Sequence, residues 1–282
     1  MQWSLNTLPS VYSMYATLKP SCDRLTDLLK HGEHWCAANL ASKTDAFTHG
    51  AAVELSDAAI GYRSAEGVVT EVLNVAKLRI EAGEFVLVCG RFGSGKSSLL
   101  SVLAGAASLL EGRVHSARSR AFVPQKCFLF NGNLKENILF GLPFHEQRYN
   151  DVLRRTALYE DLECFPQKDL SMVGENGVQL SGGQKTRVGL ARALYSDAEV
   201  YFLDDVMSAV DSHTGKHIWE HVLVWLHKQG RTVILVTHQL QYLSHFEVDR
   251  VLLLKYSAIF LNGAWDDIMG QVRCSHSLSI GR

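Results

Sequence analysis

The sequence predicts an α/β fold with a mainly parallel sheet. From about residue 50 onward, short apolar runs typical of strands alternate with longer segments in which apolar residues recur at helical spacing. The run at residues 85–89 (FVLVC) is almost wholly apolar, as expected of a strand that is buried on both faces. Strands separated by helices favour parallel pairing, because a parallel neighbour is reached through a crossover that is usually a helix.

The expected elements follow one another closely along the chain. Strands are predicted at residues 53–62, 69–80, 85–89, 121–124, 199–205, 232–238, 250–255 and 258–261. Helices are predicted at residues 96–107, 185–196 and 213–228, and a mostly helical region at 134–140 and 145–162. The helical block between the strands at 121–124 and 199–205 is long enough to form a subdomain.

The first fifty residues differ in character from the rest of the chain. Apolar side chains recur there at helical spacing, at Leu5, Leu8, Val11, Met14 and Leu18. A mixed stretch of small and polar residues follows and has the composition of a linker. We therefore expect a helical and linker segment at residues 1–50, one folded domain at 51–270 and a tail at 271–282.

Composition and charge exclude several classes of protein. The formal net charge is −1 and the isoelectric point is near 6.9, which gives no electrostatic argument for nucleic acid. The six cysteines are scattered without a CxxC pattern, and a zinc site at His31, His34 and Cys36 lacks further ligands. With no apolar stretch of membrane-spanning length and no signal peptide, the chain taken alone is expected to be soluble and cytosolic.

The strand at 85–89 runs into a glycine-rich loop that a helix follows. The loop reads Gly90, Arg91, Phe92, Gly93, Ser94, Gly95, Lys96, Ser97, Ser98 and matches the phosphate-binding pattern G-x-x-x-x-G-K-[ST]. Its glycines let backbone N–H groups surround phosphate oxygens, and the helix N-terminus adds positive charge. Lys96 would reach the β- and γ-phosphates, and Ser97 would bind Mg²⁺. The alternative is a chance glycine turn, which the flanking strand and helix disfavour.

A second apolar strand, at residues 199–205, ends in two carboxylates. Asp204 would hold the metal through water, and Asp205 would face the attacking water. On its own, an apolar strand that ends in Asp-Asp is common. Together with the phosphate-binding loop earlier in the chain, it indicates the second half of a nucleotide site.

A short glycine pair opens the helix predicted at 185–196. The sequence there is Ser181, Gly182, Gly183, Gln184. Glycines at a helix N-terminus form an anion site, although one such site already exists in the loop at 90–98. A second site is useful if it serves a nucleotide held by another subunit. A plain serine cap of the helix explains the same residues locally, and the two interpretations are compatible.

With these residues in place, the chain resembles the ABC ATPases from about residue 53 to 270. Gln125 is similar to the glutamine that senses Mg²⁺ and faces the membrane domains, and His238 to the switch histidine that contacts the γ-phosphate. Residues 208–211 (SAVD) resemble the D-loop of this family. Tyr62 is at the position where the family has an aromatic residue whose ring stacks on adenine. The resemblance implies an antiparallel β subdomain, a helical signature subdomain, and ATP with Mg²⁺ as ligands.

Two sequence segments resemble one subfamily, the C-type, multidrug-resistance-associated transporters. They are LKENILFG at 134–141 and GENGVQLSGGQK at 174–185. The stretch at 8–29 resembles the end of the last helix of a membrane domain. The resemblance therefore implies the first nucleotide-binding domain of a longer transporter, located at the cytoplasmic face of a membrane, with membrane-spanning domains and a second such domain as partners.

Two positions depart from the family pattern. Members that hydrolyse ATP well carry Glu where this chain has Asp205, and one missing methylene withdraws the carboxylate by about 1 Å, enough to cost ~10²-fold in rate. Slow turnover is therefore expected at this site. Tyr256 and Ser257 replace an expected Asp-Gly turn, which puts the hairpin between the last two strands in doubt.

Three functions remain open on the sequence. The leading one is a transporter ATPase whose closure around ATP drives transport. The second is a nucleotide-gated regulatory module with negligible hydrolysis. The third, a soluble ABC ATPase of DNA repair or translation, is disfavoured because the chain has a single such domain and no long coiled-coil insertion.

Overall fold

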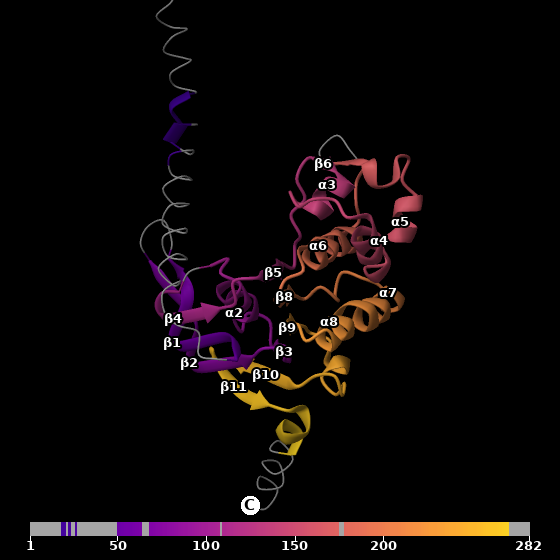
Figure 1. Ribbon diagram of the computed structural model, residues 1–282. Coiled ribbons are helices and arrows are strands. Elements are labelled where there is room, and N and C mark those ends of the chain that lie inside the picture. Colours follow the sequence, from indigo (N-terminus) through magenta and orange to yellow (C-terminus); the bar gives the residue numbers. More distant parts are fainter. Residues whose placement is uncertain are drawn as a thin grey trace, which may run out of the picture. The chain divides into compact units, whose positions relative to one another are not determined.

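The computed structural model describes residues 18–20, 22–23, 26, 50–63, 68–107, 109–174 and 178–270 (Figure 1). The chain divides into two units, Met1–Ala46 and Phe47–Arg282, and the described residues of the first unit are helical. The rest of the helical and linker segment, the cluster at His31, His34 and Cys36, and the tail at 271–282 lie outside the described residues. Within the described ranges, no helix is long and apolar enough to cross a membrane.

One continuous sheet organises the described part of the second unit. Its strand order is β4-β1-β2-β11-β10-β3-β9-β8-β5. Pairing is parallel from β10 through β3, β9 and β8 to β5, and antiparallel among β4, β1 and β2. The strands are β1 (Ala51–Arg63), β2 (Val69–Glu81), β3 (Phe85–Gly90), β4 (Glu111–Ser116), β5 (Arg120–Val123), β8 (Val200–Asp204), β9 (Thr232–Val236), β10 (Arg250–Lys255) and β11 (Ala258–Gly263).

The centre of this sheet is buried on both faces, and β3 shows how. Phe85, Leu87 and Cys89 point into one hydrophobic cluster, whereas Val86 and Val88 point into another. This division follows from the two-residue period of a strand. It explains why the run at 85–89 carries no polar alternation. Full burial of each large apolar side chain contributes about 1.5–3 kcal/mol.

Helices cover both faces of the parallel strands (Figure 1). Helix α2 (Lys96–Leu103) shares one cluster with the antiparallel strands β1 and β2, and the remaining helices supply most of the other cluster. These helices are α3 (Leu134–Leu139), α4 (Glu146–Arg155), α5 (Tyr159–Glu163), α6 (Gly182–Ser196), α7 (Ser212–Ile218) and α8 (Val224–Lys228). The predicted fold is confirmed: a mainly parallel sheet, an antiparallel β portion and a helical block between β5 and β8.

The structure also contains elements that the sequence pattern did not indicate. Strand β4 and the two-residue strands β6 (Gly132–Asn133) and β7 (Met172–Val173) were not expected. The helix predicted at 213–228 is present, but a π-helical segment, Trp219–Leu223, separates α7 from α8.

The doubt about the last hairpin proves wrong. Strands β10 and β11 pair antiparallel, with Lys255 opposite Ala258. Tyr256 and Ser257 form the two-residue turn, and both have left-handed backbones with φ of 53° and 56°. A turn of this hand matches the twist of the two strands. The turn therefore forms with backbone strain at both residues. Asn or Gly at these positions would reduce the strain, because they adopt a positive φ more readily.

Candidate functional site

The glycine-rich loop connects the carboxyl end of β3 to the first residue of α2. Gly95 caps α2 with a left-handed backbone, at φ 91°. A Cβ atom at this position would lie 3.1 Å from Val72 Cγ1 and 3.3 Å from Leu73 Cβ. Both the backbone conformation and the close approach of β2 therefore favour glycine. The loop turns back on itself at Gly95, and the N-terminus of α2 faces the cavity described below.

Lys96 lies inside the loop and not in solvent. Its side chain is buried, and Nζ donates hydrogen bonds to the carbonyl oxygens of Gly90 at 3.0 Å and Arg91 at 2.8 Å. Burial lowers the pKa of Lys96, and Asp204 and Asp205 act in the opposite direction. The ammonium group is thus held against two carbonyl groups, where a phosphate oxygen would be a stronger partner.

Ser97 and Asp204 meet across the cavity from two different elements. Ser97 Oγ donates a hydrogen bond to Asp204 Oδ1 at 3.1 Å. Asp204 is the last residue of β8, and only β9 separates β8 from β3 in the sheet. The parallel order therefore brings the carboxyl ends of both strands to one edge. Burial raises the pKa of Asp204, while the Ser97 hydroxyl acts to lower it.

Asp205 begins the loop after β8 in a conformation that is uncommon for a residue other than glycine. Its φ is 49°, and its backbone N–H donates to the Val236 carbonyl oxygen at 3.0 Å. The side chain is buried, and Oδ1 has no hydrogen-bond partner among the described residues. Ser94 Oγ is also buried and has no hydrogen-bond partner among the described residues. Buried polar atoms without partners are costly, so both atoms mark the place where a polar ligand would bind.

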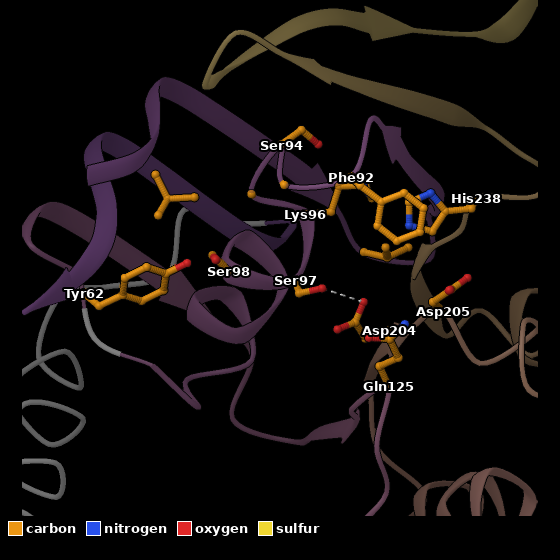
Figure 2. A pocket seen from close by; sticks show the side chains of 14 residues that line it. Tyr62, Phe92, Ser94, Lys96, Ser97, Ser98, Gln125, Asp204, Asp205 and His238 are labelled. Carbon is orange, nitrogen blue, oxygen red and sulfur yellow. Dashed lines mark hydrogen bonds between the residues drawn. The ribbon is translucent and has the colours of Figure 1, made fainter. Parts of the chain in front are cut away.

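A single cavity of about 240 Å³ joins most of the predicted site residues (Figure 2). Gln125 reaches it from the segment after β5, and Tyr62 borders it from the end of β1. Tyr62 is 59% exposed, so one face of its ring is accessible. The lining consists of Tyr62, Val72, Phe92, Gly93, Ser94, Gly95, Lys96, Ser97, Ser98, Gln125, Asp204, Asp205, Val236 and His238.

His238 and Phe92 stand at the end of this cavity opposite Tyr62 (Figure 2). Their rings are stacked, with centroids 4.3 Å apart and planes inclined by 12°. His238 and the first two loop residues, Gly90 and Arg91, also border a second, mostly apolar cavity of about 360 Å³ on the side of β10 and β11. Gly90 and Arg91 act on the first cavity through their carbonyl groups, which hold Lys96.

The four residues at 181–184 lie elsewhere, at the start of α6. Ser181 caps the helix: its Oγ accepts a hydrogen bond from the Gln184 N–H, and Gln184 Oε1 accepts one from the Ser181 N–H. Ser181 and Gly182 are exposed and do not line the cavity. Gly183 packs against the loop after β8, since a Cβ atom there would lie 2.7 Å from the Ala209 carbonyl oxygen.

The cavity has the donor atoms that a hydrated magnesium ion with a phosphate ligand requires. A carboxylate and a hydroxyl are hard oxygen ligands of the kind that Mg²⁺ prefers, and Asp204 and Ser97 supply both. The orphaned Asp205 Oδ1 adds a further acceptor. Among the described residues, no group of three or more His, Cys, Asp or Glu side chains could hold a metal ion by itself. The residues present therefore fit an ion that arrives with a nucleotide.

The sequence motifs did not predict the part that three residues of the cavity lining play. Val72 and Val236 are apolar strand residues that lack any signal of a site, and they become part of the lining through the pairing of the strands. Phe92 was assigned to the loop, but its stack on His238 depends on two segments that are far apart in sequence.

Comparisons with known proteins agree with this geometry. A family model described as ABC transporter matches residues 73–208. The chain is 40% identical over 273 residues to an ABC transporter C family member 13 of Oryza sativa subsp. indica and 38% identical over 275 residues to the ABC transporter C family member 7 of Arabidopsis thaliana. It is also 38% identical over 275 residues to the mouse ATP-binding cassette sub-family C member 2. Each alignment covers 95% of this chain but only 17–18% of the relative.

Proposed function

Since this chain contains an ABC transporter domain of the C family, we propose that it binds MgATP, hydrolyses it slowly and thereby drives transport across a membrane. The observation that carries the proposal is the meeting of Lys96, Ser97 and Asp204 in one cavity in front of the α2 N-terminus. Lys96 and Ser97 begin α2, and Asp204 ends β8. A buried lysine beside a buried carboxylate is costly unless both groups have polar or charged partners, which a bound nucleotide with its metal ion supplies.

Phosphate binding follows from the loop and the helix. Backbone N–H groups at the start of α2 and the loop glycines offer donors to phosphate oxygens. Lys96 exchanges its two carbonyl partners for the β- and γ-phosphates, which bear a full negative charge. Tyr62, exposed at the opposite end of the cavity, offers its ring face to the adenine base. The backbone N–H groups of Gly93, Ser94 and the other loop residues complete the phosphate-binding loop.

Magnesium would be held by Ser97 and Asp204, with Gln125 as a further oxygen ligand. The ion would neutralise charge on the phosphates and so assist transfer of the γ-phosphoryl group. Binding requires the Asp204 carboxylate. The raised pKa of Asp204 means that protons compete with the metal more strongly than at an exposed aspartate.

Asp205 and His238 are the residues that would act on the attacking water and the γ-phosphate. Asp205 accepts a hydrogen bond from the water through Oδ1, which lacks another partner among the described residues. Its side chain is one methylene shorter than the glutamate of efficient members of the family. The carboxylate then lies about 1 Å too far from the water, which is enough to slow the reaction ~10²-fold. We therefore propose tight binding and slow turnover.

The second half of the proposal concerns another nucleotide-binding domain. The exposed Ser181 and Gly182, with Gly183 and Gln184, lie outside this chain's own cavity. At the N-terminus of α6 they would bind the γ-phosphate of a nucleotide held by the partner domain. Two nucleotides would then lie between two facing domains, and closure of the pair would depend on both γ-phosphates.

The position of the chain in a longer protein is part of the same proposal. The chain spans less than a fifth of its C family relatives. We assign residues 1–50 to a helical and linker segment at the end of a membrane domain, 51–270 to the first nucleotide-binding domain and 271–282 to the tail that follows it. The domain would lie at the cytoplasmic face of the membrane, attached through the membrane-spanning domains of the transporter.

The test of nucleotide binding is Lys96→Ala. We expect the variant to lose binding of a fluorescent ATP analogue, because the phosphates lose their buried cation. Lys216→Ala on α7, where the side chain is 79% exposed, serves as the matched control and should bind as the unsubstituted chain does. Circular dichroism confirms that both variants are folded. Undiminished affinity of a folded Lys96→Ala variant would refute the assignment of the loop.

Asp205 also favours a second function, a nucleotide-gated regulatory module with negligible hydrolysis. The two functions share the binding step and differ in phosphate release. Release of inorganic phosphate in the presence of a competent partner domain, whose own site is disabled, supports the ATPase. Stable binding without any release supports the regulatory module.

A further inference from the structure

The imidazole ring of His238 stacks on the ring of Phe92. Neither ring nitrogen has a hydrogen-bond partner among the described residues, and the charged neighbour of the ring is Asp204. A hydrogen bond from a side chain or the backbone commonly fixes the ring of a functional histidine. The side chain is only partly buried and stands at the rim of the cavity. The stack with Phe92 is the ring contact that the described residues provide.

Phe92 is unusual as a loop residue. Its side chain is 85% exposed, so it contributes little to the hydrophobic core. One ring face is nevertheless parallel to His238 within 12°, at a centroid distance of 4.3 Å (Figure 2). Burial in the hydrophobic core therefore does not explain why a large aromatic ring stands at this position, with one face exposed and the other stacked on His238.

The sheet explains how the two rings meet. Strands β3 and β9 are parallel neighbours, with Val88 opposite Val236. His238 follows Val236 by two residues, and Phe92 follows Val88 by four, so both rings emerge from adjacent strands at the same edge. Thr237 keeps this register, because its N–H donates to the Val88 carbonyl oxygen at 3.1 Å. The stack therefore joins two loops that follow paired strands.

We propose that Phe92 is a positioning residue that holds the His238 ring toward the γ-phosphate and thereby favours ATP over ADP. The inference rests on the proposed nucleotide site and on the assignment of His238 to the γ-phosphate. The exposed ring restricts rotation of His238 about its side-chain bonds. It takes the place of the hydrogen bond that would otherwise orient the imidazole, and it leaves both ring nitrogens available to the ligand.

The variant that tests this role is Phe92→Leu, with Phe92→Tyr as the conservative exchange. Phe92 is almost fully exposed, so neither change threatens the fold. Phe246→Leu removes an equally exposed phenyl ring, which is 91% accessible and does not line the cavity, and is the matched control. In nuclear magnetic resonance spectra, the His238 ring protons should lose their upfield ring-current shift in Phe92→Leu and keep it in Phe92→Tyr.

Nucleotide affinity separates positioning from a general effect on the loop. For Phe92→Leu we expect the affinity for a non-hydrolysable ATP analogue to fall by about two- to tenfold, the loss that corresponds to one aromatic stack. The affinity for ADP should stay unchanged, because ADP has no γ-phosphate. Phe92→Tyr should restore the ATP affinity, and Phe246→Leu should alter neither value. Equal losses for ATP and ADP would instead show that Phe92 shapes the loop as a whole.

A double-variant cycle completes the test. In a His238→Ala background, Phe92→Leu should have no further effect on ATP affinity, because the residue that it positions is gone. An additional loss of the same size there would overturn the inference. Failure of the underlying site is distinguishable from failure of the positioning role. In the first case the unsubstituted chain binds neither nucleotide, and in the second it binds both while Phe92→Leu retains full preference for ATP.

Discussion

Asp205 combines three properties that make it the most informative single residue of the site. It is buried, its backbone is left-handed, and its Oδ1 lacks a partner among the described residues. Strain and unsatisfied polar atoms of this kind concentrate at functional sites. The structure thus holds this carboxylate at a cost in stability, which indicates that its position matters more than its packing.

At this position we predict that Asp205→Glu hydrolyses ATP faster than the unsubstituted chain. The additional methylene returns the carboxylate toward the attacking water, and the gain should approach the ~10²-fold that a misplacement of 1 Å costs. The measurement is phosphate release with a partner domain whose own site is disabled. Asp205→Asn, which keeps the length of the side chain but not its charge, is the control and should not gain activity. Unchanged turnover of Asp205→Glu would exclude the length of the side chain as the cause of the proposed slow hydrolysis.

The residues of the cavity were predictable from the sequence to the extent that local motifs define them. Lys96 and Ser97 come after one strand that the apolar pattern located, and Asp204 ends another. Parallel strands must bring their carboxyl ends to one edge of the sheet. The stack of Phe92 on His238 was not predictable, because it depends on strand order and on the registers of β3 and β9.

Among the elements, the hairpin of β10 and β11 forms although its turn residues are not those that such a turn favours. Tyr256 and Ser257 lack the small side chains that a left-handed turn favours, yet the turn forms. Both strands are held from outside the hairpin. Strand β10 pairs with β3 over five residues, and the Ser257 carbonyl oxygen accepts a hydrogen bond from the Asn74 N–H of β2 at 2.8 Å. Pairing with neighbouring strands thus overrides the preference of the turn residues.

This strain predicts that Ser257→Gly stabilises the protein by about 1 kcal/mol. Glycine adopts φ near 56° without steric cost, and the exposed Ser257 hydroxyl has no hydrogen bond among the described residues. The measurement is the free energy of unfolding from denaturant titration. Ser257→Ala keeps the Cβ atom and should bring no gain. An unchanged or lower stability of the glycine variant would show that the turn is not strained.

Other elements escaped prediction because they have little pattern of their own. Strand β4 has the sequence EGRVHS, which carries no run of apolar residues, and it exists because β1 offers a free edge. Strands β6 and β7 contain two residues each. By contrast, β8 and β9 are buried along their whole length and β3 along all but its last residue, Gly90. For that reason their apolar runs located them correctly.

For the molecule as a whole, ligand binding and stability are linked. A ligand that binds only the folded state raises the free energy of unfolding by about 2.7 kcal/mol at a concentration of 100 times its dissociation constant. We predict a stabilisation of this size by MgATP in thermal unfolding. Removal of Mg²⁺ with EDTA should reduce it, because Asp204 then faces the phosphates without an intervening cation.

The role of Asp204 gives this prediction a control and a pH dependence. Burial raises its pKa above the ordinary value of 3.8. In the absence of ligand, its contribution to stability is therefore complete below pH 3.8 and is lost as the pH rises through the raised pKa. At neutral pH, Asp204→Asn without ligand should be at least as stable as the unsubstituted chain. It should also gain nothing from Mg²⁺, and a retained magnesium effect would contradict the assignment of Asp204 as a ligand.

The contact between Gly183 and the Ala209 carbonyl oxygen has a consequence for communication within the chain. Ser208 Oγ donates to the Asp205 carbonyl oxygen at 2.8 Å, so the backbone at the cavity, the loop after β8 and the start of α6 form one mechanical linkage. These contacts connect Asp205 with the surface around Ser181. If a second domain docks there, the coupling free energy is the same in both directions: each nucleotide changes the affinity for the other by one common factor. Nucleotide bound for a long time at the proposed slow site would then change the nucleotide affinity of the second site for as long as it stays bound.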